Sequence, residues 1–316
     1  MQRTFAWMIA AAALALAAAA CQSAVRPDAS AIAPWTSELS SAQPREPFAA
    51  VYNRQGRVLL FIGAHHENRV ESSTFRLIAD TYAHFPIDTL ITEGSPYSDG
   101  ASPARLLHWA ARQRELDGFV EGGETVPAVR GAVASGATLF GGEPDDADIQ
   151  DRLLSMGFGA EDVLGFYVLR MIPQWTRERR IEGSSDSRLE PLVADALRRD
   201  REGLGLDASV LPDTDAWLHW YAATNGKRIE DFEPREAGPL ADGPYGSNRI
   251  NAAIGRARDA FLLETMANHF NAGENILIVY GKSHLMQLRP ALDRMLGPPC
   301  YVGSEIADAV ARCRRR

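Results

Sequence analysis

Short, continuous apolar runs that stop abruptly at glycine and polar residues recur along the chain. The clearest run, residues 58–62, is too short for an independent helix and is followed by Gly63 and then by two histidines. Residues 88–92, 137–141 and 275–279 end in a similar way. Because a strand that is buried on both faces needs apolar residues at nearly every position, these runs predict the central strands of a sheet.

Segments with apolar residues at helical spacing separate these strands. Residues 69–85 follow the first strand and predict a helical crossover, which is the connection that two parallel strands require. Further helices are expected at residues 101–116, within 122–136, and at 248–270 and 285–296, and residues 300–302 are expected to add a short edge strand. This alternation predicts an α/β fold with a mostly parallel central sheet flanked by helices.

The pattern changes in the middle of the chain. From about residue 160, long amphipathic helices follow one another without a convincing strand, and residues 230–247 form a loop rich in proline, glycine and charge. We interpret residues 160–247 as a helical cap that is inserted over the carboxyl ends of the strands. Residues 48–316, about 270 in number, suffice for a single α/β domain that carries this insertion.

The first 20 residues have the composition of a secretory signal. Arg3 is followed by an alanine-rich apolar run and then by Cys21, an order that resembles a bacterial lipoprotein signal in which Cys21 becomes the lipidated N-terminus. Gln22 rather than an aspartate then implies the outer membrane, with the domain facing the periplasm. The alternative is an ordinary cleaved signal, because Ala18 replaces the usual large aliphatic residue. Residues 21–47 are polar with several prolines and predict a flexible tether.

Charge and cysteine content narrow the class of protein further. The net charge of -8 and the isoelectric point near 5.5 argue against a nucleic-acid surface, whose affinity depends on neutralising phosphates. Apart from Cys21, the chain has two cysteines, Cys300 and Cys313. In an oxidising periplasm such a pair predicts a disulfide that pins the C-terminal helix.

Polar side chains that can carry chemistry follow each predicted strand. His65 and His66 come after the first strand, Glu93 after the second, Glu143 after the third and His284 after the last. The first and last of these strands thus both end in a Gly-x-x-His sequence. In open α/β sheets ligands bind at the carboxyl ends of the strands, so these groups are expected to converge there if the strands are neighbours.

Imidazole and carboxylate groups in one crevice support two kinds of hydrolytic chemistry. His66, Glu93 and His284 can hold a divalent metal that activates a bound water, or they can act without metal as acid and base. Arg258 would supply fixed positive charge for a developing oxyanion, which makes it the fourth catalytic candidate. The remaining substrate-binding candidates are His65, Glu143 and Lys282, and whether His65 or His66 faces the site stays open. Asp145, Asp146 and Asp148 are better explained as helix-capping residues than as a metal site.

At these residues the chain resembles a broad superfamily that includes the TraB, TIKI and GumN proteins, the ChaN haem-binding lipoproteins and the erythromycin-esterase-like hydrolases. The resemblance is carried by residues 63–66, by Glu93, by the arginine-bearing helix around residues 256–266 and by residues 281–284. It implies that both Gly-x-x-His histidines and the glutamate are functional, with a metal such as Mn, Co or Zn in the TIKI-like members. The middle of the chain is not covered.

Two functions from different classes are compatible with these residues and motifs. The first is a lipid-anchored hydrolase, with or without a divalent metal, that cleaves an ester or amide bond in a small-molecule or peptide substrate. The alternative is a ChaN-like lipoprotein that binds haem or another ligand without catalysis. Substrate identity cannot be inferred from the sequence, because apolar stripes in the helical insertion do not distinguish peptides from esters.

Overall fold

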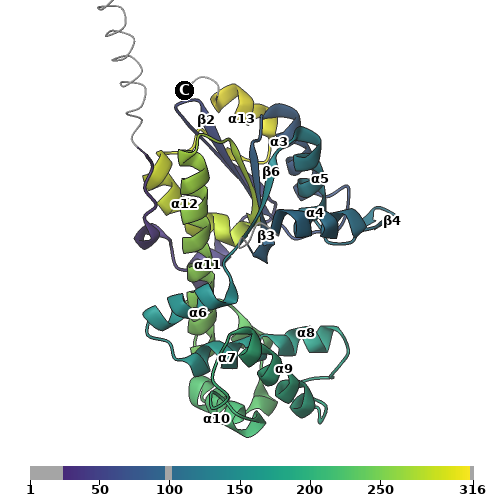
Figure 1. Ribbon diagram of the computed structural model, residues 1–316, viewed down its shortest axis with the longest axis vertical. Coiled ribbons are helices and arrows are strands. Elements are labelled where there is room, and N and C mark those ends of the chain that lie inside the picture. Colours follow the sequence, from purple (N-terminus) through teal and green to yellow (C-terminus); the bar gives the residue numbers. More distant parts are fainter. Residues whose placement is uncertain (1–23, 97–101, 314–316) are drawn as a thin grey trace, which may run out of the picture.

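The computed structural model describes residues 24–96 and 102–313. Its centre is a six-stranded sheet with the strand order β6-β3-β7-β2-β1-β8 (Figure 1). The strands are β1 (Phe48–Arg54), β2 (Arg57–Ala64), β3 (Thr89–Pro96), β6 (Thr138–Glu143), β7 (Ile276–Gly281) and β8 (Tyr301–Gly303). Strands β6, β3, β7 and β2 are parallel neighbours, so the predicted α/β fold with a mostly parallel sheet is confirmed.

The two remaining strands lie at one edge of the sheet. β1 forms an antiparallel hairpin with β2 and pairs on its other side with β8. The edge strand expected at residues 300–302 is thus present, one residue further along the chain. β1 was not predicted, because its two small alanines, Ala49 and Ala50, make its apolar run less distinct than those of the parallel strands.

Helices cover both faces of the sheet and complete a three-layer core. Alternate residues of β2 face opposite sides, with Leu60 and Ile62 in one apolar cluster and Leu59 and Phe61 in the other. The first face is covered by α3 (Ser73–His84), α4 (Ser102–Arg112), α5 (Thr125–Ser135) and α13 (Ile306–Cys313), and the second by α12 (Lys282–Leu296) and part of α11 (Gly246–Asn271). A short hairpin of β4 (Glu115–Leu116) and β5 (Phe119–Val120) follows α4.

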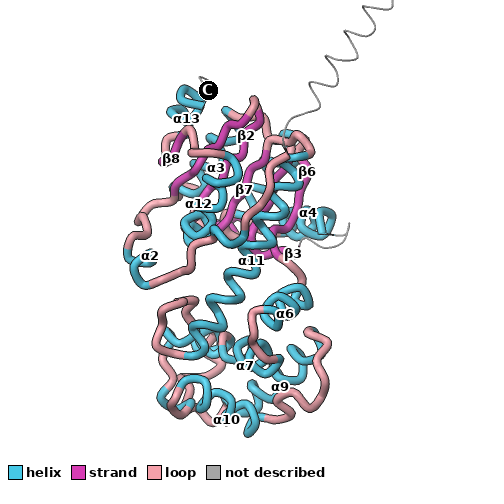
Figure 2. The backbone as a smooth tube through the Cα atoms, turned by 90° about the vertical axis from the view of Figure 1, so that its left-hand side faces the viewer, coloured by secondary structure: helices cyan, strands magenta, loops and turns pink. Residues whose placement is uncertain are grey.

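A separate helical lobe lies beyond the carboxyl ends of the parallel strands (Figure 2). It contains α6 (Asp146–Ser155), α7 (Ala160–Leu169), α8 (Met171–Arg177), α9 (Leu189–Gly203) and α10 (Thr214–Asn225), followed by the short 3-10 turns η2 (Ile229–Asp231) and η3 (Pro234–Ala237). These helices have their own apolar core, with Trp175, Trp217 and Tyr221 among its largest buried side chains. The lobe corresponds to the predicted insertion, but it begins earlier, at α6.

Helix α11 belongs to both cores. Its first half contributes Ile250 and Ile254 to the core of the lobe, whereas its second half contributes Leu263 and Phe270 to the layer against the sheet. Its 26 residues span about 39 Å, and Arg258 lies where the two halves meet. A single helix therefore ties the lobe to the sheet and presents side chains at the junction.

The segment before the first strand packs against the domain from residue 24 onward, which differs from the flexible tether expected at residues 21–47. Val25, Ile32 and Trp35 are buried, and the Val25 amide donates a 2.8 Å hydrogen bond to Oδ1 of Asn271. The segment includes η1 (Ala29–Ala31) and α2 (Ser37–Ser41). Three scattered apolar residues hold this segment against the domain. They were missed because the composition of the segment as a whole is polar and contains several prolines. The predicted signal and Cys21 lie outside the described residues.

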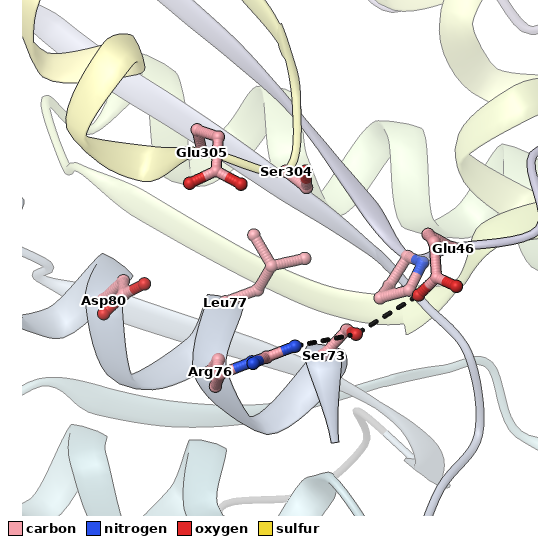
Figure 3. A pocket seen from close by; sticks show the side chains of 8 residues that line it. Glu46, Ser73, Arg76, Leu77, Asp80, Ser304 and Glu305 are labelled. Atoms are coloured by element: carbon pink, nitrogen blue, oxygen red, sulfur yellow. Dashed lines mark hydrogen bonds between the residues drawn. The ribbon is translucent and has the colours of Figure 1, made fainter. Parts of the chain in front are cut away.

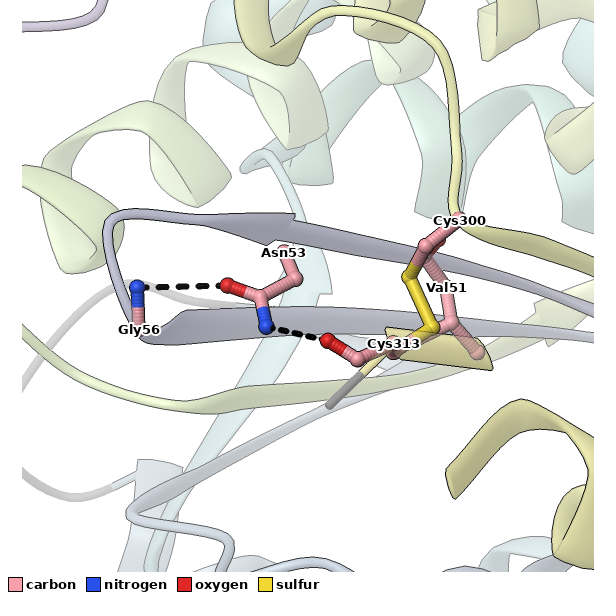
Figure 4. The surroundings of a disulfide bond; sticks show 5 residues. All are labelled: Val51, Asn53, Gly56, Cys300 and Cys313. Atoms are coloured by element: carbon pink, nitrogen blue, oxygen red, sulfur yellow. Dashed lines mark hydrogen bonds between the residues drawn. A yellow bond between two sulfur atoms is a disulfide. The ribbon is translucent and has the colours of Figure 1, made fainter. Parts of the chain in front are cut away.

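A disulfide joins Cys300 and Cys313, as expected from the sequence, with 5.2 Å between the two Cα atoms. It links the residue before β8 to the last turn of α13 (Figure 4). Nearby, Nδ2 of Asn53 donates a 2.8 Å hydrogen bond to the Cys313 carbonyl, which fastens the end of α13 to β1. Within the described part of the chain, no helix has the length and apolar character needed to cross a bilayer.

Candidate active site

Glu93 is the centre of a polar cluster at the carboxyl edge of the sheet. It follows Thr92, which pairs with Val279 of β7, so its carboxylate lies beside the end of that strand. Its Oε2 accepts a 2.7 Å hydrogen bond from the Gly281 amide, and its Oε1 accepts a 3.0 Å hydrogen bond from Nη2 of Arg258. The carboxylate is therefore held from two sides.

Gly281 is a glycine because other side chains approach its backbone closely. A Cβ at this position would lie 3.1 Å from Nε2 of His66 and 3.3 Å from Oε2 of Glu93. A larger residue would push both groups apart. The absence of a side chain at Gly281 thus leaves room for the His66 imidazole and the Glu93 carboxylate to approach each other.

His66 approaches Glu93 from the loop after β2. Its Nδ1 lies 2.6 Å from Oε1 of Glu124, and its Nε2 lies 3.9 Å from Oε2 of Glu93. Because a carboxylate accepts, Nδ1 carries the hydrogen of this bond, and Nε2 is the nitrogen that faces Glu93. The ring is 64% exposed, so water and a substrate can reach it.

His284 approaches the same carboxylate from the first turn of α12. Its Nε2 lies 3.6 Å from Oε1 of Glu93, and its Nδ1 lies 2.6 Å from Oδ1 of Asp259. Asp259 is completely buried, and its Oδ2 has no hydrogen-bond partner among the described residues. The two histidines are therefore arranged alike, each held at Nδ1 by its own carboxylate and each directing Nε2 toward Glu93.

Arg258 connects Glu93 to the next strand. Its Nε donates a 2.6 Å hydrogen bond to Oε2 of Glu143, its Nη2 bonds to Oε1 of the same carboxylate, and Nη2 also reaches Glu93. The Tyr280 hydroxyl donates a 2.8 Å hydrogen bond to Oε1 of Glu143, and the Tyr280 ring lies edge-on to His284 at 5.2 Å. One guanidinium thus pairs with two carboxylates from neighbouring strands.

Pairing with neighbouring positive charges lowers the pKa values of both glutamates in the cluster. Burial opposes ionisation of Glu93, but His284 and Arg258 hold the pKa of its carboxyl below the usual range. Burial acts on Glu143 in the same sense, and the Arg258 hydrogen bonds nevertheless lower the pKa of Glu143. Both glutamates are therefore ionised at neutral pH.

The two histidines are shifted in the opposite direction. The hydrogen bond that Nδ1 of His66 donates to the Glu124 carboxylate raises the pKa of His66. Burial alone would lower the pKa of His284, but the Asp259 carboxylate raises it, while complete burial raises the pKa of Asp259 itself. Each ring consequently holds a proton to a higher pH than a free histidine does, and the site can both accept and supply protons near neutrality.

The structure brings together the four residues predicted to be catalytic, namely His66, Glu93, Arg258 and His284. It also shows that His66 rather than His65 faces the site: the His65 side chain is exposed, and no described hydrogen bond or ion pair involves its ring. The amine of Lys282, expected to bind substrate, instead donates 2.8 Å hydrogen bonds to the carbonyls of residues 44 and 45. Glu143, also expected to bind substrate, instead accepts hydrogen bonds from Arg258.

Three residues of the site were not identified from the sequence. Glu124 comes from the turn before α5, where nothing in the local pattern indicates proximity to His66. Asp259 is adjacent to Arg258 on α11, but which neighbour it contacts depends on how that helix crosses the sheet. Tyr280 is the last apolar position of a buried strand and resembles a packing residue in the sequence.

A cleft of about 490 Å³ leads from this cluster to the helical lobe. One wall contains Gly94, Glu143 and Arg258, next to the polar cluster, and the opposite wall contains Tyr167 and Arg170 of the lobe. The other lining residues are Pro144, Asp145, Asp146, Ile149, Asn251 and Ile254. The lobe therefore forms one side of a space that borders the candidate site, as expected for a cap.

A second cleft, of about 530 Å³, lies at the β1–β8 end of the sheet (Figure 3). It is bounded by the N-terminal segment, α3 and the residues after β8. Its floor contains a chain of hydrogen bonds in which Arg76 donates to Ser73 and Ser73 donates to Glu46, each at 3.2 Å. None of the residues of the polar cluster lines it, so we do not assign it to the candidate site.

The donor types of the cluster suit a divalent ion. Two imidazole Nε2 atoms with carboxylates on Nδ1, together with one glutamate, form a set typical of Zn, Mn or Co ligands and their supporting groups. In the present arrangement the two Nε2 atoms approach different oxygens of Glu93. Among the residues that the structure describes, no group of three or more His, Cys, Asp or Glu side chains is already arranged around a common point for an ion.

The fold and the cluster define an α/β protein with a titratable site at the carboxyl ends of its parallel strands. Comparison of the chain with protein families, with curated proteins and with solved structures finds no match. The resemblance to the TraB, ChaN and erythromycin-esterase-like superfamily therefore stays a prediction, and any functional proposal depends on the geometry of the site.

Proposed function

We propose that the protein is a hydrolase that cleaves an ester or amide bond at the cluster of His66, Glu93 and His284. One observation carries this proposal. Each histidine is held at Nδ1 by a carboxylate, and both direct Nε2 toward Glu93. This arrangement supports an acid and a base on either side of one fixed negative charge.

In the proposed reaction His66 acts as the base and His284 as the acid. Nε2 of neutral His66 takes a proton from water as the water oxygen bonds to the substrate carbonyl carbon. Glu124 stabilises the imidazolium that forms, as a carboxylate does in other histidine-dependent hydrolases. When the bond to the leaving group breaks, protonated His284 supplies a proton to the leaving oxygen or nitrogen, and proton exchange with solvent resets both rings.

Glu93 and Arg258 support these steps by position and charge. Glu93 stabilises whichever ring is protonated, and its ties to Gly281 and Arg258 prevent it from moving between the two. Arg258 has its guanidinium on the wall of the cleft, so its positive charge borders the place where an oxyanion would develop.

A divalent ion would be held by His66, Glu93 and His284, with Glu124 and Asp259 orienting the two rings. Such an ion would activate a water and polarise the substrate carbonyl. Each imidazolium must lose the proton on Nε2 before that nitrogen can bind the ion. The affinity of the protein for the ion is therefore expected to rise with pH through the raised pKa values of His66 and His284. Elemental analysis and the effect of a chelator on activity test this part of the proposal.

The site of action that we propose is the cell envelope, where an acylated Cys21 would anchor the protein to the outer membrane. The Cys300–Cys313 disulfide supports an oxidising compartment. Metabolic labelling with a radioactive fatty acid, compared between the full chain and its Cys21→Ala variant, tests the anchor directly.

The catalytic proposal is tested with a panel of 4-nitrophenyl esters and aminoacyl 4-nitroanilides. His66→Gln and His284→Gln should each lower kcat/KM by roughly 100-fold or more, the size of a general acid or base contribution. His219→Gln is the matched control, because that histidine is exposed on α10. Unchanged melting temperatures would show that the variants are folded. Full activity in either site variant would refute the proposal, and a Soret band on haem addition that requires His66 would favour the ligand-binding alternative.

A further inference from the structure

Arg170 lies on the side of the helical lobe that faces the sheet across the cleft. It follows the last residue of α7 and lines the cleft opposite Arg258 and Glu143. Its guanidinium carbon lies 3.9 Å above the centre of the Tyr167 ring. Among the described residues, no hydrogen bond or ion pair involves the Arg170 side chain. Its N–H groups thus border the cleft without an acceptor from the part of the chain that the structure describes.

The Tyr167 ring that supports Arg170 is itself fixed. Tyr167 is buried in the core of the lobe, and its hydroxyl donates a 2.8 Å hydrogen bond to Oδ1 of Asp146. Stacking on a fixed ring removes much of the rotational freedom of the arginine side chain before any ligand binds. A partner of Arg170 would therefore be bound with little further loss of entropy.

The other charges of the cleft are already accounted for. Arg258 forms hydrogen bonds to Glu143 and Glu93, and Asp146 accepts the Tyr167 hydroxyl. Asp145 and Asp146 also lie at the start of α6, where the helix dipole stabilises negative charge. Arg170 is thus the cation of the cleft that no described carboxylate pairs with, and its guanidinium offers hydrogen-bond donors for an anionic group at this end of the cleft.

We propose that the cleft between the sheet and the lobe is the substrate-recognition subsite and that Arg170 binds a carboxylate of the substrate. This inference rests on the proposed hydrolase function and specifies its substrate class, namely esters or amides that carry a carboxylate away from the bond that is cleaved. The guanidinium can form two parallel hydrogen bonds with a carboxylate, a geometry that lysine lacks. Arg170 is a specificity-determining residue in this proposal and takes no part in proton transfer.

The experiment compares two esters of similar length, 4-nitrophenyl hydrogen adipate and 4-nitrophenyl hexanoate, of which only the first carries a terminal carboxylate. Arg170→Gln should raise KM for the adipate ester by about 10- to 100-fold, the range expected for hydrogen bonds to a charged group, and leave kcat nearly unchanged. The hexanoate ester should be unaffected, and Arg170→Lys should recover only part of the loss. Arg177→Gln, on the exposed surface of α8, is the matched control. Equal effects on both esters, or none, would overturn the proposal.

A second measurement separates this inference from the proposed function. Binding of N-phenylsuccinamic acid and of neutral N-phenylbutanamide is followed by calorimetry in the wild-type protein and in Arg170→Gln. Preference for the acid that disappears in the variant supports the subsite even if no ester is cleaved. Absence of that preference in the wild-type protein refutes the subsite, whatever the hydrolysis panel shows.

Discussion

Removal of the guanidinium at position 258 would leave two carboxylates facing each other without a cation. In the wild-type protein Arg258 forms hydrogen bonds to both Glu93 and Glu143, whose side chains are 21% and 14% exposed. Removing one partner of a buried ion pair typically destabilises a protein by about 3–5 kcal/mol. Since all three groups retain some contact with water, we expect Arg258→Gln to lower the free energy of unfolding by about 3 kcal/mol at pH 7.

We also expect the loss of stability in Arg258→Gln to depend on pH. In the wild-type protein the pKa values of Glu93 and Glu143 are lowered, so their contribution to stability is present above about pH 4 and disappears as the pH falls through those lowered values. Without Arg258, burial and repulsion from Glu93 raise the pKa of Glu143 above that of the unfolded chain, whereas His284 still lowers the pKa of Glu93. The variant is then destabilised increasingly as the pH rises through the raised pKa of Glu143.

Urea unfolding of both proteins between pH 4 and pH 7 measures the difference. The destabilisation by Arg258→Gln should grow steadily over this interval and become small at its acidic end. Arg152→Gln is the control, since Arg152 makes a half-buried ion pair with Glu264 of α11 that should contribute about 1 kcal/mol or less with little pH dependence. A destabilisation that is constant with pH, or below about 1 kcal/mol at pH 7, would refute the charge-pairing explanation of the cluster.

Two further predictions concern groups that support the site and the sheet. Asp259→Asn should lower the pKa of His284, shifting the alkaline limb of the kcat/KM profile to lower pH and reducing activity by roughly 100-fold; a lower plateau with an unshifted limb would show that Asp259 only fills space. Cys300→Ser with Cys313→Ser should lower the free energy of unfolding by about 3 kcal/mol, the value for a loop of this length, as measured by urea denaturation under non-reducing conditions. An equally stable serine variant would show that α13 is held by its apolar contacts alone.

The parallel strands could be predicted because their burial on both faces imposes a local pattern. A continuous apolar run ending in glycine or a polar residue identifies such strands without knowledge of their neighbours. In β1 two alanines weaken the apolar run, and the N-terminal segment has no such run. Their places depend on pairing with β2 and on a few apolar residues, such as Trp35, that contact distant parts of the chain.

The site was predictable to the extent that its residues lie at the carboxyl ends of strands. His66 and His284 follow β2 and β7, and Glu93 lies within β3, directly after the last residue of that strand that pairs with β7. Parallel strands bring such positions to one edge of the sheet. The distinction between His65 and His66 could not be made, because it depends on the turn that the chain takes after Ala64. Glu124 lies 58 residues from His66 in the chain, and no periodic pattern relates two such positions.

The shared helix α11 has a consequence for how large a ligand the cleft can admit. The chain enters the lobe through Pro144 and Asp145 and returns through a continuous helix, so the two walls are joined by a rigid rod and not by a pair of linkers. An α-helix bends little in the absence of a proline or an inserted group, and α11 has no proline. The stiffness of α11 therefore keeps the distance between the two walls constant, and this distance limits the size of the substrates that the cleft admits.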